Sequence, residues 1–259
     1  MSKLSLVIAE KPSVAQSIAT ALGVTHKHNG YLEGNGYLVS WCFGHLAGLA
    51  NADYYEAGYA KWKKEDLPIL PSPFRFLVSE DKQSQFDMLK ALLHHEDVSE
   101  VINACDAGRE GELIFRSVFY LADCQKPMMR LWISSMEDDA IREGFRNLKP
   151  GQEYDGLYHA ALCRVKADWL VGINATRFFT LIYGTKLNVG RVLSPTLAIL
   201  VQREAEIAAF VPEKHYTVNL EFAEFTASSI KFPCKVNAQS ALKKAREGTA
   251  TVKSIIIKD

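Results

Sequence analysis

The chain has 259 residues, of which 48% are hydrophobic and 23% charged, a composition typical of a folded globular protein. This excludes a mostly disordered chain, and no apolar run approaches the ~18 residues that a membrane span needs. The first residues lack the apolar core of a signal peptide. The five cysteines are odd in number and widely spaced, which argues against a disulfide framework or a cysteine-rich zinc site and predicts a cytoplasmic protein.

The 30 basic and 30 acidic residues cancel, and zero net charge taken alone argues against a general nucleic-acid binder. The charges are unevenly distributed, however. Residues 96–112 contain six acids and one base, whereas residues 156–200 contain five bases and one acid. An acidic site and a basic surface in one chain suit a metal-dependent enzyme that acts on a polyanion. Chance clustering on solvated faces is an equal alternative.

Strand-like and helical patterns alternate over the first 150 residues. Strand-like runs at 4–9, 100–105 and 129–133 are each followed by a helical pattern, at 14–22, 112–122 and 137–148. Between them lie a predicted hairpin at 30–41, an irregular segment at 47–75 and a helix at 82–94. The alternation predicts an α/β fold with a mainly parallel sheet flanked by helices.

The pattern changes near residue 150. A long helix is predicted over 154–183, and Ser194 with Pro195 is predicted to cap a second helix that ends near residue 209. Residues 216–222 and 249–257 alternate like strands, but they have no obvious partners. We therefore expect an α/β domain over 1–150, a mostly α-helical domain over 151–212 and an incomplete β segment over 213–259.

Acidic side chains follow two of the predicted strands. Glu10 comes directly after the first strand, and Asp106 comes after another, with Glu110 four residues on. If these strands are neighbours, the three acids converge at one sheet edge and suit Mg²⁺; the alternative is that each acid only stabilises a helix N-terminus. Lys11 at the same edge can bind a phosphate or donate a proton, although a solvated lysine is the simpler interpretation. His45 is interpreted as structural or substrate-contacting.

The basic half of the chain contains candidate phosphate contacts. Arg164 and Asp168 share one helix face, where a weak surface ion pair is the simplest interpretation. Arg177 lies further along the helix, and Arg191 lies in a glycine-containing loop before the next helix. Trp62 stands among three lysines, a combination that suits single-stranded nucleic acid; a partly buried loop anchor is an equal alternative.

Five motifs in order resemble a known family. Three of them, IAEKPS at 8–13, SWCFGHL at 40–46 and DAGREGE at 106–112, resemble the Toprim domain of type IA DNA topoisomerases, most closely the bacterial topoisomerase III branch. Two more, ADWLVGINATR at 167–177 and VGRVLSPT at 189–196, resemble that family's helical DNA-binding domain. The resemblance implies a Toprim domain over 1–150, part of the helical domain over 151–212 and the first strands of the gate, or arch, over 213–259.

The resemblance also implies a mechanism. These enzymes cleave one DNA strand through a tyrosine nucleophile, pass another strand through the gap and reseal it with Mg²⁺ and without ATP. It implies that Glu10, Asp106 and Glu110 are catalytic and hold the metal, that Lys11 is an acid toward the leaving oxygen and that Arg109 positions the scissile phosphate. The implied DNA contacts are Trp62, Arg164, Asp168, Trp169, Arg177, Asn188, Val189, Gly190, Arg191, Val192 and Leu193. The expected partner is single-stranded or underwound DNA, and no membrane partner is expected. The protein is expected to be a monomer, and any helicase partner is unidentified.

The sequence departs from the family pattern at two places. Gly108 stands where the family's Asp-x-Asp-x-Glu motif has its middle acid, which removes one potential metal ligand. The nucleophile motif, Tyr-x-Arg-Thr-Asp, does not occur among the 259 residues. We therefore expect an N-terminal portion that is inactive alone and cannot close the family's ring. The alternatives are a Toprim nuclease or primase-like enzyme that works without a tyrosine, and a non-catalytic fragment that binds single-stranded DNA.

Overall fold

The structure is a computed structural model that describes residues 3–249, 251 and 253. The chain forms two compact units, Met1–Pro195 and Thr196–Asp259, and each is described by itself. Within the described part of the chain, no helix combines the length and the apolar character needed to cross a membrane.

A seven-stranded sheet is the centre of the first unit, with the strand order β2-β3-β4-β1-β7-β8-β9. Its central strand, β1 (Leu4–Ala9), pairs in parallel with β4 (Tyr37–Trp41) and with β7 (Val98–Ala104). Strand β8 (Met128–Arg130) continues the parallel part, whereas β2 (His26–His28), β3 (Tyr31–Gly34) and β9 (Lys149–Pro150) pair antiparallel at the two edges. The predicted α/β fold with a mainly parallel central sheet is confirmed.

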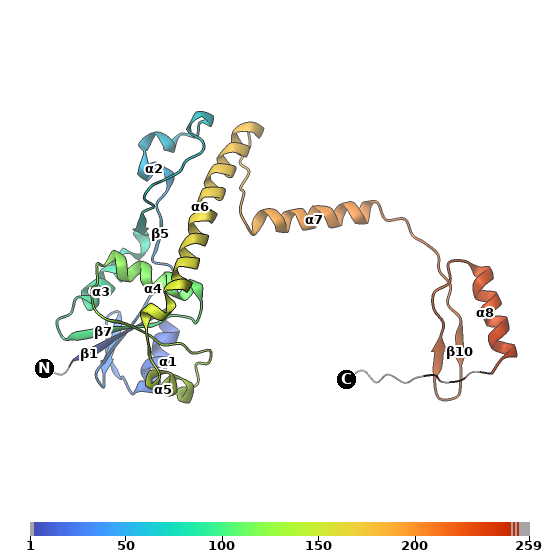
Figure 1. Cartoon of the computed structure of the whole chain (residues 1–259), viewed down its shortest axis with the longest axis horizontal. Coiled ribbons are helices and arrows are strands. Elements are labelled where there is room, and N and C mark those ends of the chain that lie inside the picture. The colour runs from blue at the N-terminus through green and yellow to red at the C-terminus, as the bar shows by residue number, and fades with distance from the viewer. Residues whose placement is uncertain (1–2, 250, 252, 254–259) are drawn as a thin grey trace. The chain divides into compact units, whose positions relative to one another are not determined.

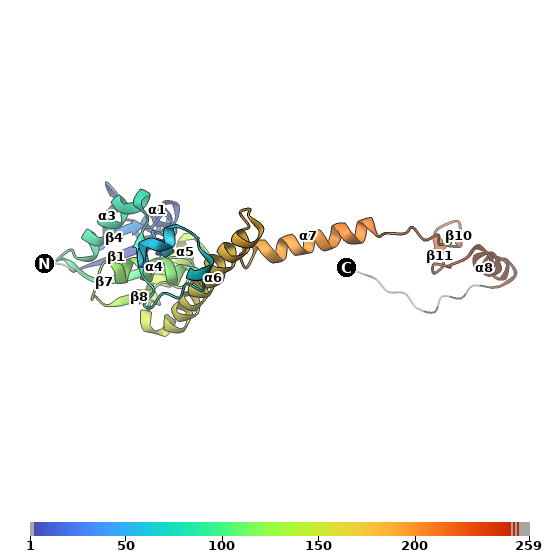
Figure 2. The ribbon, with the colours of Figure 1, turned by 90° about the horizontal axis from the view of Figure 1, so that it is seen from above.

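Helices cover both faces of this sheet (Figures 1 and 2). Alternate residues of β1 point to opposite faces, so Leu6 and Ile8 enter one apolar core while Val7 and Ala9 enter the other. The first core is closed by α3 (Gln83–Leu93) and α4 (Arg109–Leu121). The second is closed by α1 (Pro12–Leu22) and α5 (Asp138–Arg146). Burial on both sides explains why β1 reads as an almost continuous apolar run.

The segment predicted to be irregular, residues 47–75, forms with residues 76–78 an ordered arm beside the long helix α6 (Asp155–Tyr183) (Figure 1). The arm contains the antiparallel ribbon β5–β6, the helix α2 (Ala52–Tyr55) and two 3₁₀ turns, with β5 at Ala47–Leu49, β6 at Phe76–Val78, and the turns at Ala57–Ala60 and Lys64–Asp66. The Asn174 amide of α6 accepts the backbone N–H of Ile69 at 2.6 Å and donates to its carbonyl at 3.0 Å. Side chains of α6 thus form hydrogen bonds with backbone groups of the arm that have no partner in a sheet.

The second unit contains a helix that the sequence analysis missed. Strand β10 (Asn219–Glu221) pairs antiparallel with β11 (Thr226–Ser228), so the strand predicted without a partner does have one. Helix α8 (Lys235–Glu247) follows. It was missed because its less exposed face is formed mostly by small alanines, with only Ala238 fully buried. Six of the nine residues of the strand predicted at 249–257 lie outside the described residues.

The helix predicted to start after a Ser194 cap begins one residue earlier than that cap. Helix α7 spans Leu193–Ala208, so Ser194 lies in its first turn. The Ser194 hydroxyl instead accepts the backbone N–H of Gly190 at 3.1 Å and closes the preceding loop. The predicted domain limits at 150 and 212 stay predictions.

Candidate active site

The acidic residues of the sheet edge are brought together by strand pairing. Ala9 lies opposite Ala104 in the parallel pair β1–β7, so Glu10 and Asp106 follow the carboxyl ends of adjacent strands. The Glu10 side chain is only 12% exposed, and Lys11 Nζ lies 3.8 Å from its carboxylate. Asp106 is exposed. The predicted neighbourhood of the two strands is confirmed, and it places both acids at the edge of the sheet where ligands bind in open parallel sheets.

The backbone around Asp106 is held from two sides. The buried guanidinium of Arg130 donates to the carbonyl oxygens of Asn103, Cys105 and Asp106 at 3.1, 2.6 and 2.7 Å. From the other side, the first turn of α4 approaches so closely that a Cβ on Gly111 would lie 2.1 Å from the Asp106 carbonyl oxygen. Glycine is therefore required at position 111. The two contacts fix the position of the Asp106 backbone, from which the carboxylate side chain extends.

A buried charge network stands behind this edge. Glu112 is 1% exposed, and its carboxylate accepts a hydrogen bond from Arg116 Nε at 2.8 Å and lies 2.7 Å from Arg130 Nε in an ion pair. Arg116 also donates to the Gly151 carbonyl at 2.7 Å and to the Asp155 carboxylate. Burial lowers the pKa of Arg130, although Glu112 acts in the opposite direction. Glu112, Arg116 and Arg130 are buried, and the half-exposed Asp155 carboxylate supplies the second negative charge that balances the two guanidinium groups.

Glu110 begins a second, exposed chain of charges that leads away from the sheet edge. Its carboxylate lies 3.6 Å from His45 Nε2 and accepts a hydrogen bond from Arg164 at 3.0 Å. Arg164 lies 3.9 Å from Asp168, which accepts two hydrogen bonds from Arg191 Nε at 2.9 and 3.2 Å. Arg164 and Asp168 are thus more than the isolated surface pair that their spacing suggested. The first four of these residues line a cleft of about 290 Å³.

The acids fit a magnesium site of limited size. Within the part of the chain that the structure describes, no three His, Cys, Asp or Glu side chains are grouped closely enough to hold a metal ion. Glu110 is engaged by Arg164 and His45, so its role as a third ligand stays a prediction. Magnesium is commonly held by one or two carboxylates together with waters and substrate phosphates. Glu10 and Asp106 at adjacent strand ends provide that minimal donor set.

Gly108, where the motif lacks an acid, does not require glycine. Its backbone has φ 171° and ψ 177°, an extended conformation that any residue adopts, and a Cβ there would meet no heavy atom within 4 Å. An aspartate at this position would therefore be accommodated. Arg109 follows as the first residue of α4 and is exposed.

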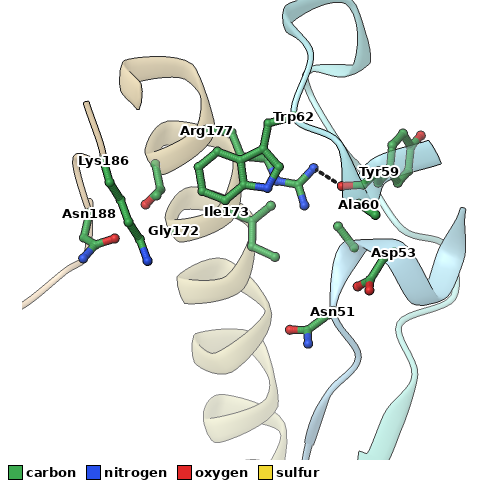
Figure 3. A pocket seen from close by; sticks show the side chains of 12 residues that line it. Asn51, Asp53, Tyr59, Ala60, Trp62, Gly172, Ile173, Arg177, Lys186 and Asn188 are labelled. Carbon is green, nitrogen blue, oxygen red and sulfur yellow. Dashed lines mark hydrogen bonds between the residues drawn. The ribbon is translucent and has the colours of Figure 1, made fainter. Parts of the chain in front are cut away.

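A second cleft, of about 450 Å³, lies between the arm and α6 (Figure 3). The Arg177 guanidinium lies 5.2 Å from the centre of the Trp62 ring and donates to the Tyr59 carbonyl at 2.9 Å. Arg177 is only 7% exposed, whereas Trp62 is 37% exposed. Arg177 was predicted as a surface cation, but the structure makes it a buried support for the indole. Polar groups on the cleft wall include Asn51, Asp53, Lys186 and Asn188.

Trp169 is a packing residue in this structure. Its Nε1 donates to the Ala50 carbonyl at 2.9 Å, and its ring meets Tyr55 and Phe74 edge-on. The loop after α6 is also held: the Val189 N–H donates to the Thr176 hydroxyl at 2.9 Å. The other residues of this loop were also predicted to contact DNA. Asn188 lies on the cleft wall and Gly190 takes part in the loop closure, while three residues are exposed: Arg191, Val192 and Leu193.

Comparison with known proteins identifies this architecture. Residues 5–136, just over half of the chain, match the family model described as the Toprim domain. The chain belongs to the Toprim family. Residues 152–259 of this Toprim-family chain match a second model, described as DNA topoisomerase. The resemblance predicted from the five motifs is confirmed.

Curated relatives share sequence with most of this Toprim-family chain. It is 48% identical over 218 residues to DNA topoisomerase 3 of Bacillus subtilis (strain 168), covering 84% of this chain and 30% of the relative. It is 44% identical over 247 residues to DNA topoisomerase 3 of Staphylococcus saprophyticus, covering 94% and 35%. The chain thus spans about a third of the length of these relatives. The structure of full-length topoisomerase I from Thermotoga maritima has the same fold, with a TM-score of 0.64 at 24% identity, over 92% of this chain and 37% of that one.

Several residues that build the site in this Toprim-family chain were missed by sequence reasoning. Glu112 and Arg116 stand four apart on a predicted helix, a spacing that indicates an ion pair but not that it is buried. Arg130 carries no local signal, because its side-chain partners, apart from the carbonyl of the adjacent Leu131, lie 18 or more residues away in the sequence. Asn174 was part of a quoted motif, but its contact with Ile69 spans 105 residues.

Replacing Glu112 with glutamine tests the buried charge network. The amide keeps the shape of the side chain but leaves two buried guanidinium groups without their shared anion, and removing one partner of a buried ion pair costs about 3–5 kcal/mol. We expect the free energy of urea unfolding to fall by about that amount. Glu143→Gln, at an exposed position of α5, should leave it unchanged. Equal stabilities for the two variants would contradict the role given to Glu112.

Alanine at two neighbouring glycines tests the close approach at Asp106. Helix propensity alone predicts that Gly111→Ala in α4 stabilises the protein by about 0.5–1 kcal/mol. The contact with the Asp106 backbone predicts the opposite sign, a loss of about 1–3 kcal/mol from overpacking. Gly108→Ala, with open space around its Cβ, is the control without a clash; because Gly108 is the N-cap of α4, it should lose at most about 1 kcal/mol. A stabilised Gly111→Ala protein would show that α4 stands further from Asp106.

Proposed function

We propose that this chain provides the metal-binding centre and the DNA-binding groove of a type IA topoisomerase, which cleaves and rejoins single DNA strands without ATP. One observation carries the proposal: successive turns of α6 line both the cleft at Glu110 and the cleft at Trp62. Arg164 and Arg177 are 13 residues apart, about 20 Å along a helix. A single groove that runs from an acidic edge to an exposed indole suits a single strand whose backbone reaches the metal edge and whose base stacks on tryptophan.

The charged residues of the groove would exchange partners when a strand binds. Arg164 and Arg191 are each held by carboxylates, at 3.0 Å from Glu110 and 2.9 Å from Asp168. Phosphate oxygens accept the same charge-assisted hydrogen bonds from a guanidinium, so a phosphate would replace the carboxylate as the partner of each arginine. Binding therefore releases Glu110 toward the metal edge. This exchange couples the arrival of DNA to the completion of the acidic site.

The chemistry at the sheet edge follows from the groups present. Glu10 and Asp106 would hold Mg²⁺, which when bound neutralises charge on the scissile phosphate. Lys11, whose exposed Nζ lies 3.8 Å from Glu10, would donate a proton to the leaving oxygen. Arg109, exposed at the start of α4, would hold the phosphate. The attacking group in this proposal is a tyrosine in a Tyr-x-Arg-Thr-Asp context, so the 259 residues alone should form no covalent adduct with DNA.

The Trp62 cleft would hold a base. The Arg177 guanidinium lies against the indole, which is 37% exposed and lines the cleft (Figure 3). The cleft walls present amide and carboxylate groups from Asn51, Asp53 and Asn188. We place this activity in the cytoplasm, because all five cysteines are free thiols and three of them are buried.

Asp106→Asn tests the metal site. Loss of one of two carboxylates should weaken Mg²⁺ binding measured by titration calorimetry, whereas Gly108→Asp should strengthen it because the position accommodates a third acid. Because phosphate oxygens complete the metal shell in this proposal, Mg²⁺ should raise the affinity of the wild-type chain for an oligothymidylate but not that of Asp106→Asn. Equal Mg²⁺ affinity in the wild type and Asp106→Asn would exclude this site.

Trp62→Ala and Arg191→Ala should change DNA binding in different ways. Loss of the indole should cost about 1–3 kcal/mol of binding free energy, with little change in the salt dependence. Loss of Arg191 should reduce the slope of log K against log salt by about 0.7, the value for one phosphate contact on a single strand. Fluorescence anisotropy with a labelled oligothymidylate at several salt concentrations measures both. Two variants that bind like the wild type would place the groove elsewhere.

A further inference from the structure

A third cleft, of about 440 Å³, lies where the arm meets α4 and the start of α6, and the proposed groove does not use it. Its walls are rich in aromatic side chains, which come from all three elements. Tyr54 is 54% exposed and Tyr120 is 50% exposed, so about half of each side chain is open to a ligand. The lining residues that matter here are Tyr54, Phe74, Arg75, Phe76, Tyr120 and Tyr158.

The cleft is positively charged. Arg75 is its only charged lining residue, and Lys166 Nζ lies 5.6 Å from the centre of the Phe74 ring at its border. Within the described part of the chain, neither Arg75 nor Lys166 forms an ion pair. This differs from the proposed groove, where Arg164 and Arg191 are each paired with an acid. These cations have no acidic partner and lie beside exposed aromatic rings. The complementary ligand is therefore an anion that also has a flat, apolar part.

The cleft is separate from the proposed groove but adjacent to it. Arg164 and Lys166 are two residues apart on α6, so their side chains leave the helix on different faces. Phe76 in the β5–β6 ribbon lines both the cleft at Glu110 and this one. The ribbon is therefore the wall between them, and a strand that leaves the first cleft has a second surface within reach.

We propose that this aromatic cleft, defined by Tyr54, Phe74, Arg75, Tyr120 and Tyr158, is a second binding site for single-stranded nucleic acid. Bases stack on the exposed rings of Tyr54 and Tyr120, and Arg75 and Lys166 contact the phosphates. Aromatic grooves also bind proline-rich peptides, but such a ligand gives the two unpaired cations no anionic partner. The inference goes beyond the proposed function, because it adds a site that takes no part in cleavage.

Cross-linking with the 259-residue chain tests the site directly. A 20-nucleotide oligothymidylate that carries 5-iodouracil is irradiated with the protein, and the cross-linked peptides are mapped by mass spectrometry. We expect adducts at Tyr54 or Tyr120 in the wild type and also in Arg164→Ala, in which the proposed groove is weakened. Adducts that map only to the Trp62 cleft would overturn the inference and leave the proposed function standing.

Affinity measurements in the Trp62→Ala background separate stacking from charge. Tyr54→Ala should weaken oligothymidylate binding at least about fivefold, the lower limit for loss of one stacked base, while Tyr54→Phe keeps the ring and the affinity. Arg75→Ala should lower the salt slope by about 0.7, and Lys27→Ala, an exposed lysine on β2, should not. Unchanged binding in both cleft variants, or displacement of the oligonucleotide from the cleft by a proline-rich peptide, would overturn the inference.

Discussion

The buried carboxylate of Glu112 is the interaction on which the positions of the other site residues depend. Through Arg130 it fixes the carbonyls that follow β7, and with them Asp106. Through Arg116 it fixes Gly151, just before α6, and so the helix that lines the proposed groove. Each buried ion costs several kcal/mol to desolvate, so the network is favourable only when all its members are present. The sheet edge at Asp106 and helix α6 are therefore set in place together.

The exposed charges follow a different rule from the buried ones. Along the proposed groove, acids and arginines alternate from Glu110 to Arg191, and each arginine is already paired. Such pairs are weak in water, so a phosphate can replace the carboxylate at small cost. This explains how a chain with zero net charge is suited to a polyanion. The arginines stay ordered by nearby acids, and net charge is a poor guide to binding in this case.

The sequence predicted those features that depend on local pattern. The apolar runs at β1 and β7 indicated buried parallel strands, and their ends placed Glu10 and Asp106 at one edge. The arm was predicted to be irregular because its order comes from α6, through contacts such as Asn174 with Ile69 across 105 residues. Arg130 is beyond sequence reasoning for the same reason, since no periodicity indicates a buried guanidinium on a short strand.

Trp62 and Arg177 lie in contact with each other, but the structure gives them different roles. The family resemblance implies that Trp62 and Arg177 both contact DNA, and the structure buries the Arg177 guanidinium against the indole. Burial lowers the pKa of Arg177, with Asp53 and Asp66 acting against it, and the group stays charged because an arginine does not lose its proton in proteins. A charge held there contributes to the support of the ring more than to the capture of phosphate. Base stacking and phosphate contact in the proposed groove are thereby assigned to different residues, the first to Trp62 and the second to Arg164 and Arg191.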